Sequence, residues 1–350
     1  MILDNNLVDA VLIISSINRR YFTNFDSSDG MLLITKENSY LLLDFRYIEA
    51  ARQQVSDIEV VLFESLSDSL GQILKKNNVK SVAFENELLT LKDAAFFESI
   101  LKELGVNPVF NDKLDYYIKQ TRIIKSDEEI SLIKKAQEIS ELSLNKVIEN
   151  LRPGMTEREI ALEIEFLMRK QGAEAVAFDL IVVSGKNSSL PHGVPGDKKI
   201  ACGDLITFDI GARYNGYNSD MTRTICLGKA NEEQRQVYNT VLEAQKRAID
   251  MVRSGISCDK VDLCARNYIY EAGYKGFFGH ATGHGVGVQI HEAPSVSPRS
   301  STILKSNMII TVEPGIYLPN KFGVRIEDML IVKENGCENI TQMEKNLIEL

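Results

Sequence analysis

The fold is decided by the segment DLITFDIGARYNGYNSDMTRTICLG, residues 204–228, in which two apolar stretches flank Asn215-Gly216. An Asn-Gly pair between such stretches is the strongest short hairpin signal and predicts a type I′ turn. With these two residues as the loop, Asp209 and Asp220 fall on the same face of the hairpin. They are then diagonal neighbours, about 7–8 Å apart at the backbone.

The loop length also fixes the pairing of the two aspartates. Asp209 is expected to face Thr222, and Asp220 to face Gly211. An acidic pair in a hairpin is usually a solvated face, but these two strands are apolar enough to be internal. Two carboxylates this close repel each other unless a cation lies between them.

A second acidic pair lies in NMIITVEPGIYLPNKFGVRIEDMLIV, residues 307–332, which predicts two strands joined by a turn at 319–323. Glu313 and Glu327 share a face only if the connection has an odd number of residues or a bulge intervenes. Pro314-Gly315 is a candidate bulge. The sequence leaves this register open.

The protein has four histidines, and three of them lie in FGHATGHGVGVQIHEAP, residues 278–294. A single histidine is more often a hydrogen-bonded structural residue than a ligand. The glycines that flank His284 allow close backbone approach and leave the imidazole accessible. The clustering of His280, His284 and His291, with His192 in the same part of the chain, therefore favours a functional site.

These segments together supply four carboxylates and one imidazole, from Asp209, Asp220, His284, Glu313 and Glu327. Four buried acids would strongly destabilise the fold unless several were protonated, whereas two divalent cations neutralise them. Oxygen-rich ligation with one imidazole suits Mn²⁺, Co²⁺, Fe²⁺ or Zn²⁺, and geometry alone does not choose among them. Two such ions about 3.5–4 Å apart activate a water molecule and polarise a substrate oxygen, which is hydrolase chemistry.

Residues 9–110 alternate short apolar stretches with helical patterns, which is typical of an α/β unit. The expected strands are DAVLIIS, GMLLIT and SYLLLDF, and the expected helices cover 46–55, 66–77 and 91–104. A capping box of Ser126 and Glu129 then begins a long helix. We therefore expect two domains, residues 1–122 and 123–350.

The second domain contains an internal repeat, in which residues 152–172 align without gaps on residues 253–273. Both copies predict a helix end, a turn, a capped helix and a terminal glycine. Any two capped helices share these features, but each copy is also followed by an apolar strand, a histidine-bearing loop and an acidic hairpin. The expected class is α+β, with two similar halves around one site.

The composition excludes several classes of protein. The 350 residues carry a net charge of −9, from 40 basic and 49 acidic residues, which argues against a nucleic-acid binder. The apolar runs fall short of the roughly 18 residues that cross a bilayer, and the first residues lack the features of a secretory signal. Five cysteines without a C-x-x-C pair argue against a disulfide framework. We therefore expect a cytoplasmic protein with no membrane partner.

Six motifs of the second domain occur in a specific order: SLPHG (189–193), DIGARYNGYNSDMTRT (209–224), GHGVG (283–287), HEAP (291–294), EPGIY (313–317) and RIED (325–328). In this order they resemble the pita-bread metallopeptidases, a family that includes aminopeptidase P, prolidase, methionine aminopeptidase and the metal-free creatinase. The amino-terminal NRRYFTNFDSSDGMLLIT (18–35) and LLLDFRYIEAAR (41–52) resemble the creatinase-type domain of the proline-specific members. The resemblance covers essentially the whole chain. It implies a pita-bread catalytic domain with a pseudo-two-fold repeat, preceded by a smaller creatinase-like α/β domain.

The same resemblance implies a set of metal ligands. Asp209 and Asp220 are expected to hold one metal ion, and His284 and Glu313 the other. Asp220 and Glu327 are expected to bridge the two ions. Glu313 is also the expected proton shuttle between the attacking hydroxide and the leaving nitrogen.

Other residues are expected to act on the peptide or to orient the acids. The resemblance implies that His192, His280 and His291 hydrogen-bond the peptide and stabilise the tetrahedral intermediate. Arg325, two residues before Glu327, is expected to orient the acids. Arg299 is a candidate for binding a substrate carboxylate, although a surface arginine in a polar loop fits its sequence equally well.

The proline-specific members cleave the bond between a first residue and a following proline, a tertiary amide whose nitrogen lacks a hydrogen. We therefore expect an Xaa-Pro exopeptidase, and favour an aminopeptidase over an Xaa-Pro dipeptidase because no dedicated carboxylate clamp is obvious. A methionine aminopeptidase would leave the first domain unexplained. A creatinase-like hydrolase or a non-catalytic binding protein would not require all five ligands. The expected partners are proline-containing peptides or dipeptides and, by resemblance, a second copy of the chain.

Overall fold

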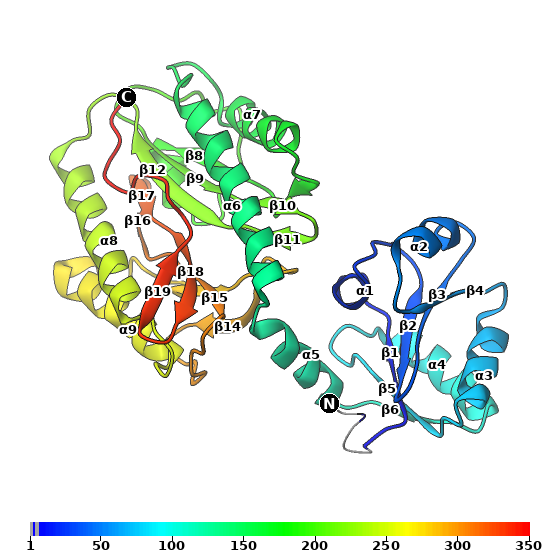
Figure 1. Ribbon diagram of the computed structural model, residues 1–350. Coiled ribbons are helices and arrows are strands. Elements are labelled where there is room, and N and C mark those ends of the chain that lie inside the picture. Colours follow the sequence, from blue (N-terminus) through cyan, green and yellow to red (C-terminus); the bar gives the residue numbers. More distant parts are fainter. Residues whose placement is uncertain (1–2, 4–6) are drawn as a thin grey trace. The chain divides into compact units, whose positions relative to one another are not determined.

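The computed structural model describes Leu3 and residues 7–350, and the chain divides into two compact units, Met1–Thr121 and Arg122–Leu350 (Figure 1). We retain residues 1–122 and 123–350 as the proposed domains. Each unit has its own apolar core. Within the described residues, no helix has the length and apolar character needed to span a membrane.

The first unit is built on a mixed six-stranded sheet with the order β4-β3-β2-β1-β5-β6. The strands are β1 (Ala10–Ile13), β2 (Met31–Thr35), β3 (Ser39–Leu43), β4 (Glu59–Leu62), β5 (Ser81–Phe84) and β6 (Asn107–Val109). The helices are α1 (Ser16–Thr23), α2 (Ile48–Gln54), α3 (Leu66–Lys76), α4 (Leu91–Glu103) and α5 (Lys113–Ile123). The expected strands and helices form as β1 to β3 and α2 to α4, whereas β4, β5, β6, α1 and α5 were not anticipated.

The second unit contains four long helices and several small sheets. The helices are α6 (Asp127–Ile148), α7 (Glu157–Lys170), α8 (Glu232–Met251) and α9 (Cys258–Ile269), with a 3₁₀ turn η1 (Gly185–Ser189) and a π turn η2 (Tyr270–Tyr274). The strands are β7 (Ala175–Val176), β8 (Ile181–Ser184), β9 (Leu205–Ile210), β10 (Ala212–Tyr214), β11 (Tyr217–Asn218), β12 (Met221–Cys226), β13 (Gly283–Gly285), β14 (Glu292–Val296), β15 (Ile309–Val312), β16 (Gly315–Leu318), β17 (Phe322–Arg325), β18 (Asp328–Lys333) and β19 (Gly336–Asn339). The capping box of Ser126 and Glu129 forms as predicted and begins α6.

The second unit consists of two halves. In the first half, α6 and α7 pack with the sheet β12-β9-β8. In the second half, α8 and α9 pack with the sheet β14-β13-β15-β18-β19, and the two helices lie side by side (Figure 1). The first acidic hairpin supplies β9 and β12 of the first sheet, and the second acidic hairpin supplies β15 and β18 of the second.

The two halves begin their second helix with the same backbone contact. The amide of Glu157, the first residue of α7, donates to the carbonyl of Lys198 at 3.0 Å. The amide of Cys258, the first residue of α9, donates to the carbonyl of Thr302 at 2.9 Å. The side-chain caps differ, because α7 begins with a capping box whereas Ser257 makes no side-chain cap on α9. The repeat is thus present in the backbone, but only one copy has the expected cap.

Candidate active site

The first hairpin has the register that its sequence predicts. Asp209 on β9 pairs with Thr222 on β12. The loop residues Asn215 and Gly216 have φ angles of 45° and 81°, the positive values that a type I′ turn requires. This register turns Asp209 and the buried Asp220 to one face of the hairpin.

The structure settles the register of the second hairpin. β15 pairs with β18, and β16 with β17, in one continuous register. The connection between β16 and β17 has three residues, 319–321, so the odd loop length alone places Glu313 opposite Glu327 without a bulge at Pro314-Gly315. The amide of Glu327 has its partner outside this hairpin and donates to the carbonyl of Thr222, on β12, at 3.1 Å. This contact joins the two acidic hairpins.

His284, on β13, faces the acids through one ring nitrogen. Its Nδ1 lies 3.1 Å from the carbonyl oxygen of Gly285. Because a carbonyl only accepts, Nδ1 carries the proton and Nε2 keeps a free lone pair. Nε2 lies 3.4 Å from Asp220 Oδ2 and 3.4 Å from Glu313 Oε1. Burial, and then repulsion from His291, lowers the pKa of His284 to about 4, so the imidazole is neutral at pH 7.

The acids around His284 are only partly satisfied by hydrogen bonds and ion pairs. Asp220, His284 and Glu327 each place one donor atom within 4.8 Å of the others. Asp209 Oδ1 and Glu327 Oε1 are buried and have no hydrogen-bond partner among the described residues. Burial raises the pKa of Glu313 to about 8, and burial with repulsion from neighbouring acids raises the pKa of Asp220 and Glu327. This donor set fits divalent cations, which would satisfy the orphaned oxygens and the free nitrogen together.

Arg325 connects the two hairpins to a histidine. Its Nε donates to Thr222 Oγ1 at 3.0 Å, and a terminal nitrogen forms an ion pair with Asp209. The other terminal nitrogen donates to the hydroxyl of Tyr317 at 2.8 Å, and this hydroxyl lies 2.9 Å from His280 Nε2. His280 Nδ1 donates to a backbone carbonyl, so Nε2 accepts the tyrosine proton. Burial, and then the charge of Arg325, lowers the pKa of His280 to about 3 and keeps it neutral.

One cavity of about 550 Å³ brings the candidate residues together. It is lined by His192, Asp209, Asp220, His280, His284, His291, Glu313, Arg325 and Glu327. The exposed His192 and His291 belong to its wall, and Phe178 and Val194 add apolar surface. Arg299 is exposed and does not line this cavity, so it is not placed to bind a substrate there.

Tyr317, which contacts the cavity residues Arg325 and His280, is a residue that the sequence analysis missed. A Cβ at Gly315 would lie 2.6 Å from the Tyr317 hydroxyl, and one at Gly323 would lie 2.8 Å from its ring. Both positions must therefore be glycine to accommodate the phenol. Alternation along the strand puts Tyr317 on the face of Glu313, and this parity, with two nearby glycines, was the available signal.

The comparisons with known proteins agree with this geometry. The sequence profile of metallopeptidase family M24 matches residues 131–334, and that of the creatinase/prolidase N-terminal domain matches residues 2–124. An Xaa-Pro dipeptidase of Pyrococcus furiosus is 42% identical over 348 residues, which cover 99% of this chain and 97% of that protein.

Solved structures align along nearly the whole chain. An Xaa-Pro dipeptidase from Bacillus anthracis aligns with a TM-score of 0.94 and 40% identity, over 100% of this chain and 97% of the other. An X-Pro aminopeptidase from Thermotoga maritima aligns with a TM-score of 0.92 and 38% identity, over 98% of both chains.

Proposed function

The chain belongs to metallopeptidase family M24, and on that premise we propose that it is a proline-specific dipeptidase, which hydrolyses the bond between an N-terminal residue and a C-terminal proline. The family and the fold class expected from the sequence are confirmed by the matches over both units. The relatives support a proline-specific metallopeptidase, as the sequence predicted.

The observation that carries this proposal is the composition of the 550 Å³ cavity. It combines four acids whose charge lacks full compensation, one neutral imidazole with a free lone pair, and three further histidines. A cavity of this size encloses a small peptide. Its chemistry suits hydrolysis rather than simple binding, since the acids are costly to bury unless they hold cations.

We propose Asp209, Asp220, His284, Glu313 and Glu327 as the ligands of two divalent ions, with Mn²⁺ as the expected metal. Such ions supply a Lewis acid and a water molecule of lowered pKa when bound. The cluster places two aspartates from the first hairpin and two glutamates from the second around one imidazole.

The other cavity residues act on the peptide. Glu313 relays a proton from the attacking water to the proline nitrogen, which carries no hydrogen of its own. The neutral His280 lines the cavity, and its expected hydrogen bond to the peptide would replace the one that Nε2 makes with Tyr317. His192 and His291 donate hydrogen bonds from the wall to the substrate's oxygens. Arg325 orients Asp209 through their ion pair.

The sequence favoured an aminopeptidase, and the relatives shift the balance to a dipeptidase. Xaa-Pro dipeptidases of two Pyrococcus species are 41% and 42% identical to this chain. Aminopeptidase activity is the second candidate, because the Thermotoga maritima structure matches nearly as well. A homodimer and a cytoplasmic location also belong to this proposal, as expectations from the sequence.

Matched peptides distinguish the two activities. The protein is reconstituted with Mn²⁺, and hydrolysis of Xaa-Pro and Xaa-Pro-Yaa peptides is measured beside a chelated control, with metal content determined on the same sample. Cleavage confined to the dipeptide establishes the dipeptidase. Cleavage of the tripeptide overturns it in favour of the aminopeptidase, and cleavage of neither by metal-loaded protein overturns the proline specificity.

A further inference from the structure

Glu157, the first residue of α7, is a fully buried carboxylate outside the metal cluster. Its Oε1 accepts from the amide of Ser184 at 2.7 Å and from the Ser184 hydroxyl at 2.8 Å. Asn187 Nδ2 lies 3.2 Å from both oxygens, and the amide of Gly196 lies 3.3 Å from Oε2. Among the described residues, no lysine or arginine forms an ion pair with it. Neutral donors of one chain segment therefore offset the cost of burying this charge.

That segment is the loop that carries His192. Glu157 binds the start of the loop through Ser184 and Asn187, and its end through Gly196. The His192 side chain is exposed and has no hydrogen bond within the described structure. Because nothing grips the imidazole itself, the backbone of the loop sets its position in the cavity. Glu157 thus holds both ends of the loop, while Arg325 and the amide of Gly323 bind its middle at the Pro191 carbonyl and the Ser188 hydroxyl.

The other half of the unit shows that the fold does not require an acid at this position. The internal repeat aligns Glu157 with Cys258, the first residue of α9. Both residues make the same backbone contact to the following segment, which therefore forms with either side chain. The Glu157 carboxylate is therefore not needed for this backbone contact, and it lies in the half that carries the exposed His192.

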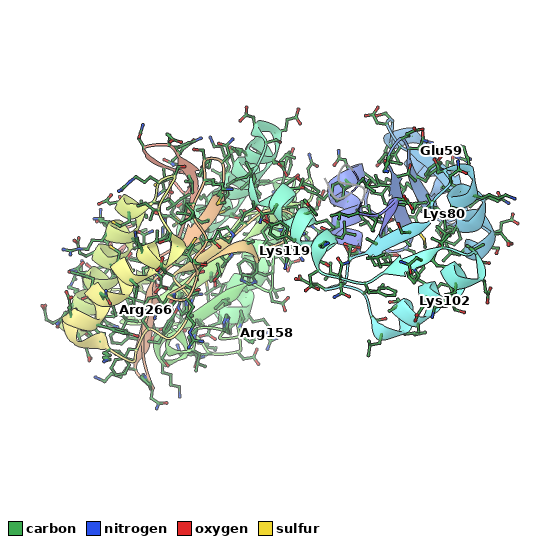
Figure 2. The ribbon with its side chains drawn as sticks, turned by 90° about the horizontal axis from the view of Figure 1, so that it is seen from below. Glu59, Lys80, Lys102, Lys119, Arg158 and Arg266 are labelled. Atoms are coloured by element: carbon green, nitrogen blue, oxygen red, sulfur yellow. The ribbon has the colours of Figure 1, made fainter. Side chains whose placement is uncertain are left out.

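The second half holds its own histidine loop with a different acid. Asp262 on α9 accepts from the amide and the hydroxyl of Thr282, at 3.1 and 2.8 Å. It also pairs with Arg266, labelled in Figure 2, at 2.7 Å. Arg266 donates to the carbonyl of His280 at 2.7 Å. In each half, a buried acid on the second helix binds the loop that delivers a histidine to the cavity.

We propose that Glu157 is a positioning residue for catalysis, which holds the loop 184–196 so that His192 reaches the substrate. This inference rests on the proposed function, because His192 needs a peptide to act on. Glu157 is not among the residues that line the cavity, and it acts through His192.

The test is a double-mutant cycle of Glu157→Gln and His192→Ala on the metal-loaded protein. Glutamine keeps the shape but turns one acceptor into a donor, which opposes the donors of Asn187 and Gly196. Glu157→Gln is expected to lower kcat/KM for the dipeptide about 10–100-fold at unchanged metal content. In the double variant, the Glu157→Gln change should add less than about twofold to the loss caused by His192→Ala. If the losses of the two single variants multiply in the double variant, the proposal is overturned.

A matched control and a second variant separate positioning from folding. Glu159→Gln changes an exposed acid two residues along α7, and it should leave kcat/KM within about twofold. Asn187→Ala releases one anchor without placing a new donor against the loop, so it should reproduce part of the Glu157→Gln loss if that variant folds poorly. Equal losses for Glu159→Gln would contradict the proposal.

Limited trypsin digestion tests the anchor without any assay of activity. Lys186 is exposed inside the loop, between the anchor points. Its cleavage should become at least about tenfold faster in Glu157→Gln and stay unchanged in Glu159→Gln. If wild-type protein cleaves no Xaa-Pro peptide but shows this pattern, the function fails while the anchor stands. Unchanged cleavage in Glu157→Gln overturns the anchor itself.

Discussion

The two halves of the catalytic unit share a backbone but treat their histidines differently. In the second half, His280 is partly buried, hydrogen-bonded to Tyr317 and carried by a loop that an Asp262–Arg266 ion pair holds. In the first half, His192 is exposed and unbonded, and neutral donors alone connect its loop to Glu157. His280 therefore lies in a part of the cavity that a buried ion pair holds, which we call the floor. His192 lies in a part that we call the wall, whose loop is held by Glu157, by the amide of Gly323 on Ser188 and by Arg325 on the carbonyl of Pro191.

The same contrast extends to the acids. Glu313 and Glu327 of the second half face each other directly across one hairpin. Asp209 and Asp220 of the first half sit on one face of their hairpin, and Asp209 is gripped by Arg325 from the second half. The second half thus orients part of the first. The two similar halves thus contribute unequally to the candidate site.

The largest effect is expected from removing an acid of either half. Asp220→Ala and Glu327→Ala each delete a proposed bridging ligand, one from each hairpin. Both variants should lose metal and at least about 10³-fold in kcat, because the charges and the activated water are lost together. Metal analysis and kinetics on the same samples provide the measurement. If one variant retained full activity, the substituted acid would not be a metal ligand, and the proposed site would not include that residue of its half.

Stability should separate the two loop anchors next. Asp262→Asn leaves the guanidinium of Arg266 buried without its charge partner, which costs about 3–5 kcal/mol. Glu157→Gln disturbs hydrogen bonds to neutral groups and should cost only about 1–3 kcal/mol. Urea unfolding of the two variants gives the free energies. Equal losses would show that both loops are held with the same strength, against the contrast between floor and wall.

The sequence predicted the first hairpin and left the second open for a physical reason. Asn215-Gly216 demands positive φ at both positions, so the turn and its register follow from two residues. The loop of the second hairpin has no such signature, and its odd length appears only in the structure. The close backbone approach expected at the glycines beside His284 is also observed, because a Cβ at Gly283 would lie 2.0 Å from the carbonyl oxygen of Thr311.

Contacts between distant segments were not readable from local patterns. Glu157 was not singled out from the sequence, because its partners Ser184 and Gly196 lie far along the chain. The sequence of Arg299 fitted a substrate ligand and a surface arginine equally well, and the structure exposes it outside the cavity. The ligand set was predicted from the residue types and the order of the motifs. The residues that support this set depend instead on which distant loop packs against a helix.

A smaller effect is expected where the halves meet at Arg325. Arg325→Lys keeps the charge but loses the planar fork that contacts Asp209, Thr222 and Tyr317 together. It should lower kcat/KM about 10–100-fold with most of the metal retained. Kinetics with metal analysis measure this. Complete loss of metal would mean that Arg325 builds the site, whereas no loss of activity would mean that the second half does not orient the first.

The smallest effect concerns the pH dependence of stability without metal. Burial raises the pKa of Glu313 to about 8, so the native state keeps a proton that the unfolded chain releases above about pH 4.3. The unfolded state then binds fewer protons, and the free energy of unfolding falls as pH rises from about 5 to 8. Metal-free protein should lose at least about 2–4 °C in Tm over this range.

Metal should reverse this trend, because it binds the charged carboxylates that metal-free protein disfavours. The gap in Tm between metal-loaded and chelated protein should therefore widen from pH 5 to 8, as measured by calorimetry at both pH values. Glu313→Gln cannot release a proton, so its metal-free form should lose less Tm with rising pH than the wild type. If it loses as much, the dependence arises from Asp220 of the first half and Glu327, whose pKa values burial also raises. The pH dependence of stability would then arise from acids of both halves.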